Sequence, residues 1–231
     1  MTSLRACKFR TPTVTRCNLL AFIFALLTAG FGPELLPQSQ TEQNAYDNLP
    51  DPRLVTLLKS ISGKPGRTDL FPQDGRYLYD LILKNKLASG LEIGASGGYA
   101  AIWLGMAFRQ TGGRLVSVES SKEPGRGALG SLEQAGLLDK VDLLQDNPFK
   151  VIPMLTGPFD FVFLDARKQD YVRYLKLLLP KVRPGGFFVA HDVTDKSRDL
   201  ADFIRSITGD PHLKTEFVPV SRAGMSVTKK L

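Results

Sequence analysis

The chain has 231 residues, of which 43% are hydrophobic and 23% charged, with 21 glycines, 15 prolines and two cysteines. This composition is typical of a globular protein and excludes collagen-like, low-complexity and disulfide-scaffold proteins. Of the formal net charge of +7, four charges come from Arg5, Lys8, Arg10 and Arg16, which precede the first acidic residue, Glu34. The remaining 26 basic and 23 acidic residues leave only +3. The charge therefore does not indicate a nucleic-acid partner.

Residues 1–30 have the pattern of an export signal. Residues 1–18 are basic and free of acids, and residues 19–29 form an apolar run that ends near small residues. Eleven apolar residues span ~16 Å as a helix, well short of the ~30 Å core of a bilayer. We expect a signal peptide or N-terminal anchor over residues 1–30, a linker over 31–50, and an exported or membrane-tethered protein that contacts membrane only through this segment. A wrongly assigned start codon would instead leave the protein cytoplasmic.

From about residue 51 onward, strand-like and helix-like segments alternate. Strands are expected to end at 91–93 and to cover 114–118, 141–144, 159–164 and 187–190, with a turn at 184–186; helices are expected over 99–108, 123–138, 171–179 and 195–207. This alternation implies right-handed crossovers and a parallel sheet.

The last two strand-like segments, residues 215–220 and 225–228, are separated by only four residues. So short a link cannot make a parallel crossover, so these segments should form an antiparallel hairpin. The sequence therefore predicts an α/β fold over residues 51–231: a doubly wound, seven-stranded, mostly parallel sheet with a terminal antiparallel hairpin.

A glycine-rich loop, Gly94-Ala95-Ser96-Gly97-Gly98, follows the first expected strand, where open α/β sheets bind their ligands. The loop does not match the dinucleotide-binding pattern Gly-x-Gly-x-x-Gly, because Ser96 stands at its third position. Glu92 precedes the loop by two residues and would repel a pyrophosphate, whereas it would attract an ammonium. S-adenosylmethionine carries an ammonium and a sulfonium and no phosphate. The alternative is that Glu92 is a solvated residue at a strand end.

Two further polar groups follow the next two strands. Glu119 ends the second strand, where a carboxylate can accept hydrogen bonds from both ribose hydroxyls. Gln145-Asp146-Asn147 follows the third strand, where the edge of an adenine would lie. Polar groups after three successive strands favour a nucleoside-containing ligand.

Residues 71–231 resemble class I S-adenosylmethionine-dependent methyltransferases, and among them the catechol and caffeoyl-CoA type of O-methyltransferase. The matching segments are Leu91 to Tyr99, Val118-Glu119, Phe163 to Lys168, Pro184-Gly185-Gly186 and Gln73-Asp74-Gly75. The resemblance implies a Rossmann-like methyltransferase fold and S-adenosylmethionine as the cofactor.

The resemblance also implies roles for individual residues. Glu92 would hold the methionine ammonium, Glu119 the ribose, and Asp146 with Asn147 the surroundings of the adenine, while Gly94, Ala95, Ser96, Gly97 and Tyr99 would belong to the cofactor loop. Asp165 would contact the cofactor region and a divalent metal, and Lys168 would be the general base.

The sequence departs from the family after the fifth strand. The family has Ala-Asp-Asn there, and both polar residues bind a divalent metal, whereas this chain has Ala190-His191-Asp192. Asp165, His191 and Asp192 are the candidate ligands for Mg²⁺ or Mn²⁺, although imidazole suits zinc or iron better. His191 is alternatively a catalytic base, because an ordinary histidine titrates near physiological pH. The use of a metal stays open.

We therefore predict an enzyme that transfers a methyl group from S-adenosylmethionine to a hydroxyl of a small molecule, with Lys168 or His191 as the catalytic residue. The resemblance allows either a monomer or a homodimer. One alternative is an exported nucleoside-binding domain without catalysis, which the export signal and the altered metal motif favour. Another is an NAD-binding oxidoreductase, against which Glu92 and the terminal hairpin argue.

Overall fold

The computed structural model of the protein describes residues 43–62, 70–194 and 198–231. The predicted export signal at 1–30 and most of the predicted linker lie outside the described residues. Within the described part of the chain, no helix is both long and apolar enough to cross a bilayer.

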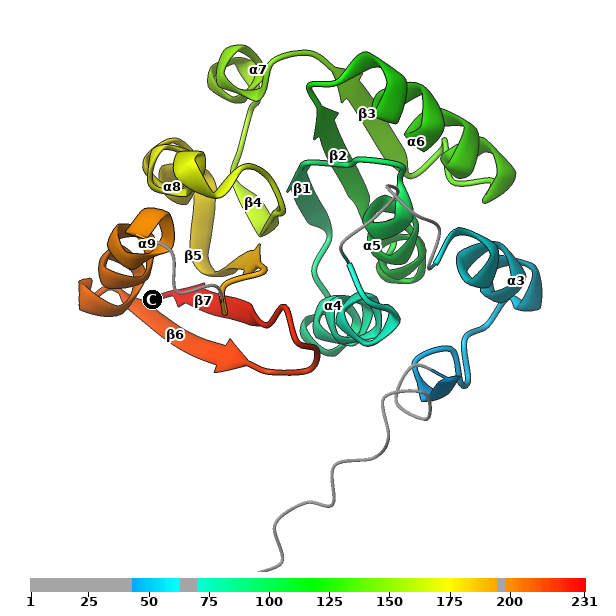
Figure 1. Cartoon of the computed structure of the whole chain (residues 1–231), viewed down its shortest axis with the longest axis horizontal. Coiled ribbons are helices and arrows are strands. Elements are labelled where there is room, and N and C mark those ends of the chain that lie inside the picture. Colours follow the sequence, from blue (N-terminus) through cyan, green and yellow to red (C-terminus); the bar gives the residue numbers. More distant parts are fainter. Residues whose placement is uncertain (1–42, 63–69, 195–197) are drawn as a thin grey trace, which may run out of the picture. The chain divides into compact units, whose positions relative to one another are not determined.

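A seven-stranded sheet forms the centre of the domain (Figure 1). Its strands are β1 (Ser89–Ile93), β2 (Arg114–Glu119), β3 (Val141–Gln145), β4 (Phe159–Leu164), β5 (Val182–His191), β6 (Leu213–Val218) and β7 (Met225–Lys230). They lie in the order β3-β2-β1-β4-β5-β7-β6. Strands β1 to β5 are parallel, and β7 runs antiparallel to both β5 and β6. This confirms the predicted fold.

Helices cover both faces of the sheet, as Figure 1 shows. One apolar cluster joins the sheet to α3 (Pro52–Ile61), α4 (Pro72–Asn85), α5 (Tyr99–Thr111) and α6 (Lys122–Gln134). The other joins it to α7 (Pro148–Met154), α8 (Tyr171–Leu178) and α9 (Arg198–Gly209), and the 3₁₀ turns η1 (Lys168–Asp170) and η2 (Leu179–Lys181) flank α8. Strand β4 contributes Phe161 and Phe163 to the first cluster and Val162 and Leu164 to the second. Its continuous apolar sequence therefore reflects burial on both faces.

Four helices differ from the expectation, because α3, α4 and α7 were not predicted and α6 is shorter than expected. Helix α6 ends at Gln134 rather than at 138, because Gly136 has a positive φ of 59° and breaks the helical path. Helix α7 was not predicted, although its start has a clear signal. The Asn147 side chain caps the helix by accepting a hydrogen bond from the Phe149 N–H, and Pro148 occupies the first helical position.

The prediction of a turn at residues 184–186 is wrong, because these residues lie within β5. Strand β5 already begins at Val182, which pairs with Phe159, and the register then shifts so that Phe187 pairs with Phe161. The extra residues on β5 form an irregularity in the strand, in which Gly185 has a φ of +76°. Pro-Gly-Gly therefore marks a break in the register of β5 rather than a turn before it.

Residues 43–50 pack with the domain, although a linker was expected over 31–50. Ala45 and Tyr46 are buried, the Tyr46 ring stacks on Trp103 at 5.8 Å between centroids, and the Tyr46 hydroxyl lies 3.1 Å from that of Tyr99. Burial of an aromatic ring of this kind contributes on the order of 2 kcal/mol, so the end of the predicted linker belongs to the core.

Candidate functional site

The glycine loop joins β1 to α5 at the carboxyl edge of the sheet. Gly94 has a φ of +101°, and a Cβ added there would lie 2.0 Å from the carbonyl oxygen of Asp165, which follows β4. Only glycine allows this approach. Ser96 has a φ of 48°, an uncommon conformation for a residue with a side chain, and its N–H donates to Glu119 Oε2 at 2.8 Å. Such backbone strain often occurs at functional sites.

Glu119 connects the glycine loop to the loop that follows β2. Its second oxygen, Oε1, accepts a hydrogen bond from the Ser121 N–H at 2.7 Å, and the residue is only 7% exposed. Because each carboxylate oxygen can accept more than one hydrogen bond, Glu119 retains capacity for a diol such as ribose. The two backbone contacts hold the carboxylate in place before any ligand binds.

Glu92 is fully buried in β1. The Ser117 hydroxyl donates to its Oε2, but Oε1 has no hydrogen-bond partner among the described residues. The pKa of Glu92 is raised to about 8, mainly by burial; the Ser117 hydrogen bond lowers it, and the charges of Asp165 and Glu119 add to the rise. Above pH 4.5 the raised pKa therefore costs stability, and this cost grows until the pH passes 8. A cation bound at Oε1 would offset it.

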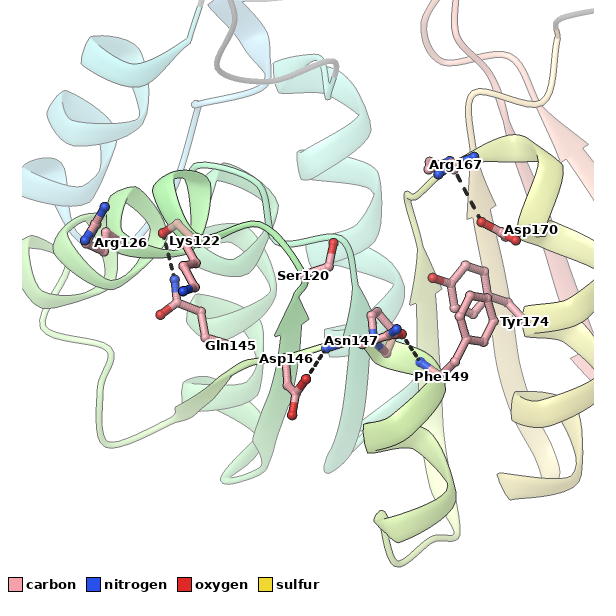
Figure 2. Close-up of a pocket in the computed structure, with 11 residues that line it drawn as sticks. Ser120, Lys122, Arg126, Gln145, Asp146, Asn147, Phe149, Arg167, Asp170 and Tyr174 are labelled. Atoms are coloured by element: carbon pink, nitrogen blue, oxygen red, sulfur yellow. Dashed lines mark hydrogen bonds and ion pairs between the residues drawn. The ribbon is translucent and has the colours of Figure 1, made fainter.

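A cavity of about 600 Å³ opens beside these loops, at the ends of β2, β3 and β4 (Figure 2). This volume suits a ligand of nucleoside size. The lining residues are Ser120, Lys122, Arg126, Gln145, Asp146, Asn147, Pro148, Phe149, Arg167, Asp170 and Tyr174. Both residues predicted to surround an adenine, Asp146 and Asn147, are among them.

Part of the cavity wall is aromatic. The rings of Phe149 and Tyr174 stack at 4.5 Å with an interplanar angle of 9°, and the Arg173 guanidinium lies 3.6 Å from the centre of the Phe149 ring. Sequence reasoning missed most of this wall, which comes from the first turns of α6, α7 and α8. The available signal was that Ser120 directly follows one matched motif and Arg167 lies within another.

Tyr99 does not line this cavity. Its side chain is 1% exposed and packs edge-on against Trp103 in the core, at 6.5 Å between centroids. The assignment of Tyr99 to the cofactor loop stays a prediction, and any contact with the cofactor would come from its backbone, because its side chain is buried. Tyr99 instead starts α5 directly behind the glycine loop.

His191, at the end of β5, lies between two carboxylates. Its Nε2 is 3.0 Å from Asp74 Oδ2, and its Nδ1 is 3.3 Å from Asp165 Oδ2 in an ion-pair contact. Asp74 lies in α4, is fully buried, and also accepts a hydrogen bond from the Ser221 hydroxyl at 2.7 Å. Sequence reasoning missed Ser221, and noted Asp74 only as part of a matching motif.

This environment is at odds with the expectation that His191 is a base. Burial by itself lowers the pKa of His191, but its contacts with Asp165 and Asp74 outweigh burial and raise the pKa to about 10. At neutral pH the imidazole is therefore a cation, with no lone pair available to accept a proton.

Lys168, in η1, forms an ion pair with Asp192, which directly follows β5. Asp192 adopts a left-handed conformation with a φ of 55°. Both side chains are partly exposed, at 26% and 32%, so the pair is in contact with solvent. The structure thus brings Asp165, Lys168, His191 and Asp192 together at the ends of β4 and β5, as predicted.

The residues at this edge do not fit a Mg²⁺ or Mn²⁺ site. Across residues 43–62, 70–194 and 198–231, no group of three or more His, Cys, Asp or Glu side chains is arranged to hold a metal ion. Mg²⁺ and Mn²⁺ prefer sets of oxygen ligands, whereas here an imidazole faces Asp165 and an ammonium holds Asp192.

Comparison with known proteins identifies the family. A family model described as a methyltransferase domain matches residues 91–193. Catechol O-methyltransferase of Mycobacterium tuberculosis is 33% identical over 154 residues, which cover 66% of this chain and 70% of that protein. The chain belongs to the catechol and caffeoyl-CoA type of S-adenosylmethionine-dependent O-methyltransferases. A catechol O-methyltransferase of Niastella koreensis is 32% identical over 149 residues, which cover 62% of this chain and 66% of that protein.

Solved structures of O-methyltransferases have the same fold. The O-methyltransferase from Bacillus cereus in complex with SAH has a TM-score of 0.71 at 24% identity, covering 84% of this chain and 97% of that one. TomG from Streptomyces achromogenes in complex with SAM has a TM-score of 0.66 at 25% identity, covering 78% and 90%. S-adenosylmethionine is therefore the methyl donor, and the oxidoreductase and non-catalytic alternatives are not supported.

Proposed function

We propose that this O-methyltransferase binds S-adenosylmethionine across the ends of β1 to β4 and methylates a hydroxyl of a small molecule held beside Lys168 and Asp192. The observation that carries this proposal is the fully buried Glu92, whose Oε1 lacks a partner among the described residues. A buried acid of this kind, beside a strained glycine loop, is best explained as the partner of a ligand cation.

The cofactor's three parts have matching groups along this edge. The methionine ammonium would pair with Glu92, and the ribose hydroxyls would donate to Glu119, which two backbone N–H groups already orient. The adenine would enter the cavity lined by Asp146 and Asn147 (Figure 2). This order places the sulfonium near the glycine loop.

In the transfer itself, the acceptor oxygen attacks the methyl carbon in line with the carbon–sulfur bond. The electron pair of that bond goes to sulfur, which leaves as the neutral thioether of S-adenosylhomocysteine. The hydroxyl proton passes to the Lys168–Asp192 pair, at the Asp192 carboxylate, while the Lys168 ammonium stabilises the negative charge that develops on oxygen. Holding the two reactants in line supplies much of the remaining rate enhancement.

Loss of the Glu119 carboxylate should abolish cofactor binding. In calorimetric titrations with S-adenosylhomocysteine, we expect one site per chain and an affinity at least about 100-fold lower in E119A, because both ribose hydrogen bonds and the loop anchor are removed. E133A, a change at an exposed glutamate of α6, is the matched control and should bind like the wild type. Equal affinity in E119A and E133A would contradict the assignment.

Lys168 should affect turnover and leave cofactor binding unchanged. With an acceptor found by screening hydroxyl compounds, we expect K168M to lower kcat by about 100-fold or more, the usual contribution of a positioned group that stabilises a developing oxyanion. The KM for S-adenosylmethionine should stay the same, because the ammonium faces the acceptor. K176M, at an exposed lysine of α8, is the control. A kcat for K168M within a factor of two of K176M would remove Lys168 from the mechanism.

We also propose that residues 1–30 direct export or anchor the protein to a membrane. Support comes from the sequence, in which an acid-free basic segment precedes a short apolar run. Expression of the full chain, followed by cell fractionation and mass spectrometry of the N-terminus, tests this. We expect either a cleaved N-terminus near residue 30 or full-length protein in the membrane fraction. An intact chain found wholly in the cytoplasm would contradict the proposal.

A further inference from the structure

We infer that this enzyme works without a divalent cation, because the side chains that would bind one are held by contacts within the protein, and that it accepts molecules with a single reactive hydroxyl. This inference rests on the proposed function, since it concerns the acceptor side of the same site. It follows from the contacts that each candidate metal ligand, here called a donor, makes at the ends of β4 and β5.

The first donor, His191, is hydrogen-bonded at Nε2 and faces a second carboxylate at Nδ1. Nε2 lies 3.0 Å from a carboxylate oxygen of the fully buried Asp74, and Nδ1 lies 3.3 Å from a carboxylate oxygen of Asp165. A neutral imidazole that donates from Nε2 would direct the lone pair of Nδ1 at Asp165, which is repulsive. A cationic ring is attracted to both carboxylates and neutralises charge that burial makes costly.

The second donor, Asp192, is also engaged. Its carboxylate holds the Lys168 ammonium in an ion pair, so a metal at this point would have to displace a cation of the protein. Asp165 faces His191 in turn. A divalent ion would therefore enter an edge at which Asp192 already pairs with the Lys168 ammonium of η1 and Asp165 already faces His191 of β5.

The acceptor class follows from this arrangement. A metal ion activates an acceptor by chelation, and chelation favours two adjacent oxygens on the substrate. An ammonium such as that of Lys168 stabilises one developing oxygen anion and gains little from a second hydroxyl. The site therefore suits phenols or alcohols with a lone hydroxyl, and an adjacent hydroxyl is not required.

A metal titration of the intact, EDTA-treated protein tests the inference. The protein is saturated with S-adenosylhomocysteine, and binding of Mn²⁺ is followed by electron paramagnetic resonance and that of Co²⁺ by visible absorption. We expect no one-to-one binding of either ion up to millimolar concentration. One-to-one binding of Mn²⁺ or Co²⁺ that D192N weakens would overturn the inference. With Co²⁺ it would instead establish Asp74, His191 and the metal as a carboxylate–histidine–metal arrangement.

A gain of metal binding provides the complementary test. H191D removes the imidazole and adds a carboxylate beside Asp74 and Asp165, so we expect one-to-one Mn²⁺ binding and a Tm that rises with Mn²⁺. H212D makes the same change at the exposed histidine and should show neither effect. A folded H191D that does not bind Mn²⁺ would contradict the inference that the His191 imidazole is what prevents metal binding. If H191D does not fold, the wild-type titration alone decides.

Turnover tests the acceptor class, using a phenol and a catechol that share the same side chain, with EDTA present. We expect the phenol to be methylated at a rate within about tenfold of the catechol, because one ammonium serves one oxygen. Activity confined to the catechol and abolished by EDTA would overturn the inference. Binding of S-adenosylhomocysteine, measured on the same samples, separates this outcome from failure of the proposed function.

Discussion

Negative charge buried at the carboxyl edge of the sheet is the constraint on which the site depends. Asp74 and Glu92 are fully buried, Glu119 is nearly so, and Asp165 is 23% exposed. Carboxylates in such a setting need cations or hydrogen-bond donors. His191 compensates Asp74 and Asp165, and backbone N–H groups compensate Glu119. Glu92 has one hydroxyl donor and a pKa raised to about 8, so it stays largely protonated at pH 7 and becomes charged when a cationic ligand binds.

The same charges hold the site's elements together. The His191 imidazole connects β5 to α4 through Asp74 and to the end of β4 through Asp165, while Glu119 connects two loops. A weakened His191 contact would therefore change the acceptor side and the cofactor side together. In this chain the His191 side chain joins the end of β5 to the end of β4 through Asp165 and to α4 through Asp74.

The fold could be predicted from the sequence because its signals are local, and the residues proposed to bind the cofactor are indicated by equally local signals. Strand periodicity, the glycine loop and Glu92 each lie within a few residues of the feature that they indicate, and the structure places them as expected. The acceptor side could not be predicted in the same way. The partners of His191 are 117 and 26 positions away along the chain, and no sequence pattern states that Asp74 and Asp165 would face its two nitrogens.

Burial accounts for the other differences. The position of Tyr99 in a matched motif did not indicate that its ring packs with Tyr46 and Trp103 in the core. The Pro-Gly-Gly segment looks like a turn, yet pairing with β4 keeps it within β5 as an irregularity. In both cases long-range packing overrode a local preference, as is common where the competing preference is weak.

Proton release on cofactor binding tests the central claim most directly, because it measures the charge that Glu92 gains. With a pKa of about 8, Glu92 is about nine-tenths protonated at pH 7 and ionises when an ammonium binds. Calorimetric titration with S-adenosylhomocysteine at pH 7, in buffers of different ionisation enthalpy, gives the number of protons released. We predict that the wild type releases about 0.9 proton more than E92Q. Equal proton release by the two proteins would show that Glu92 does not receive the cation, and would contradict the account.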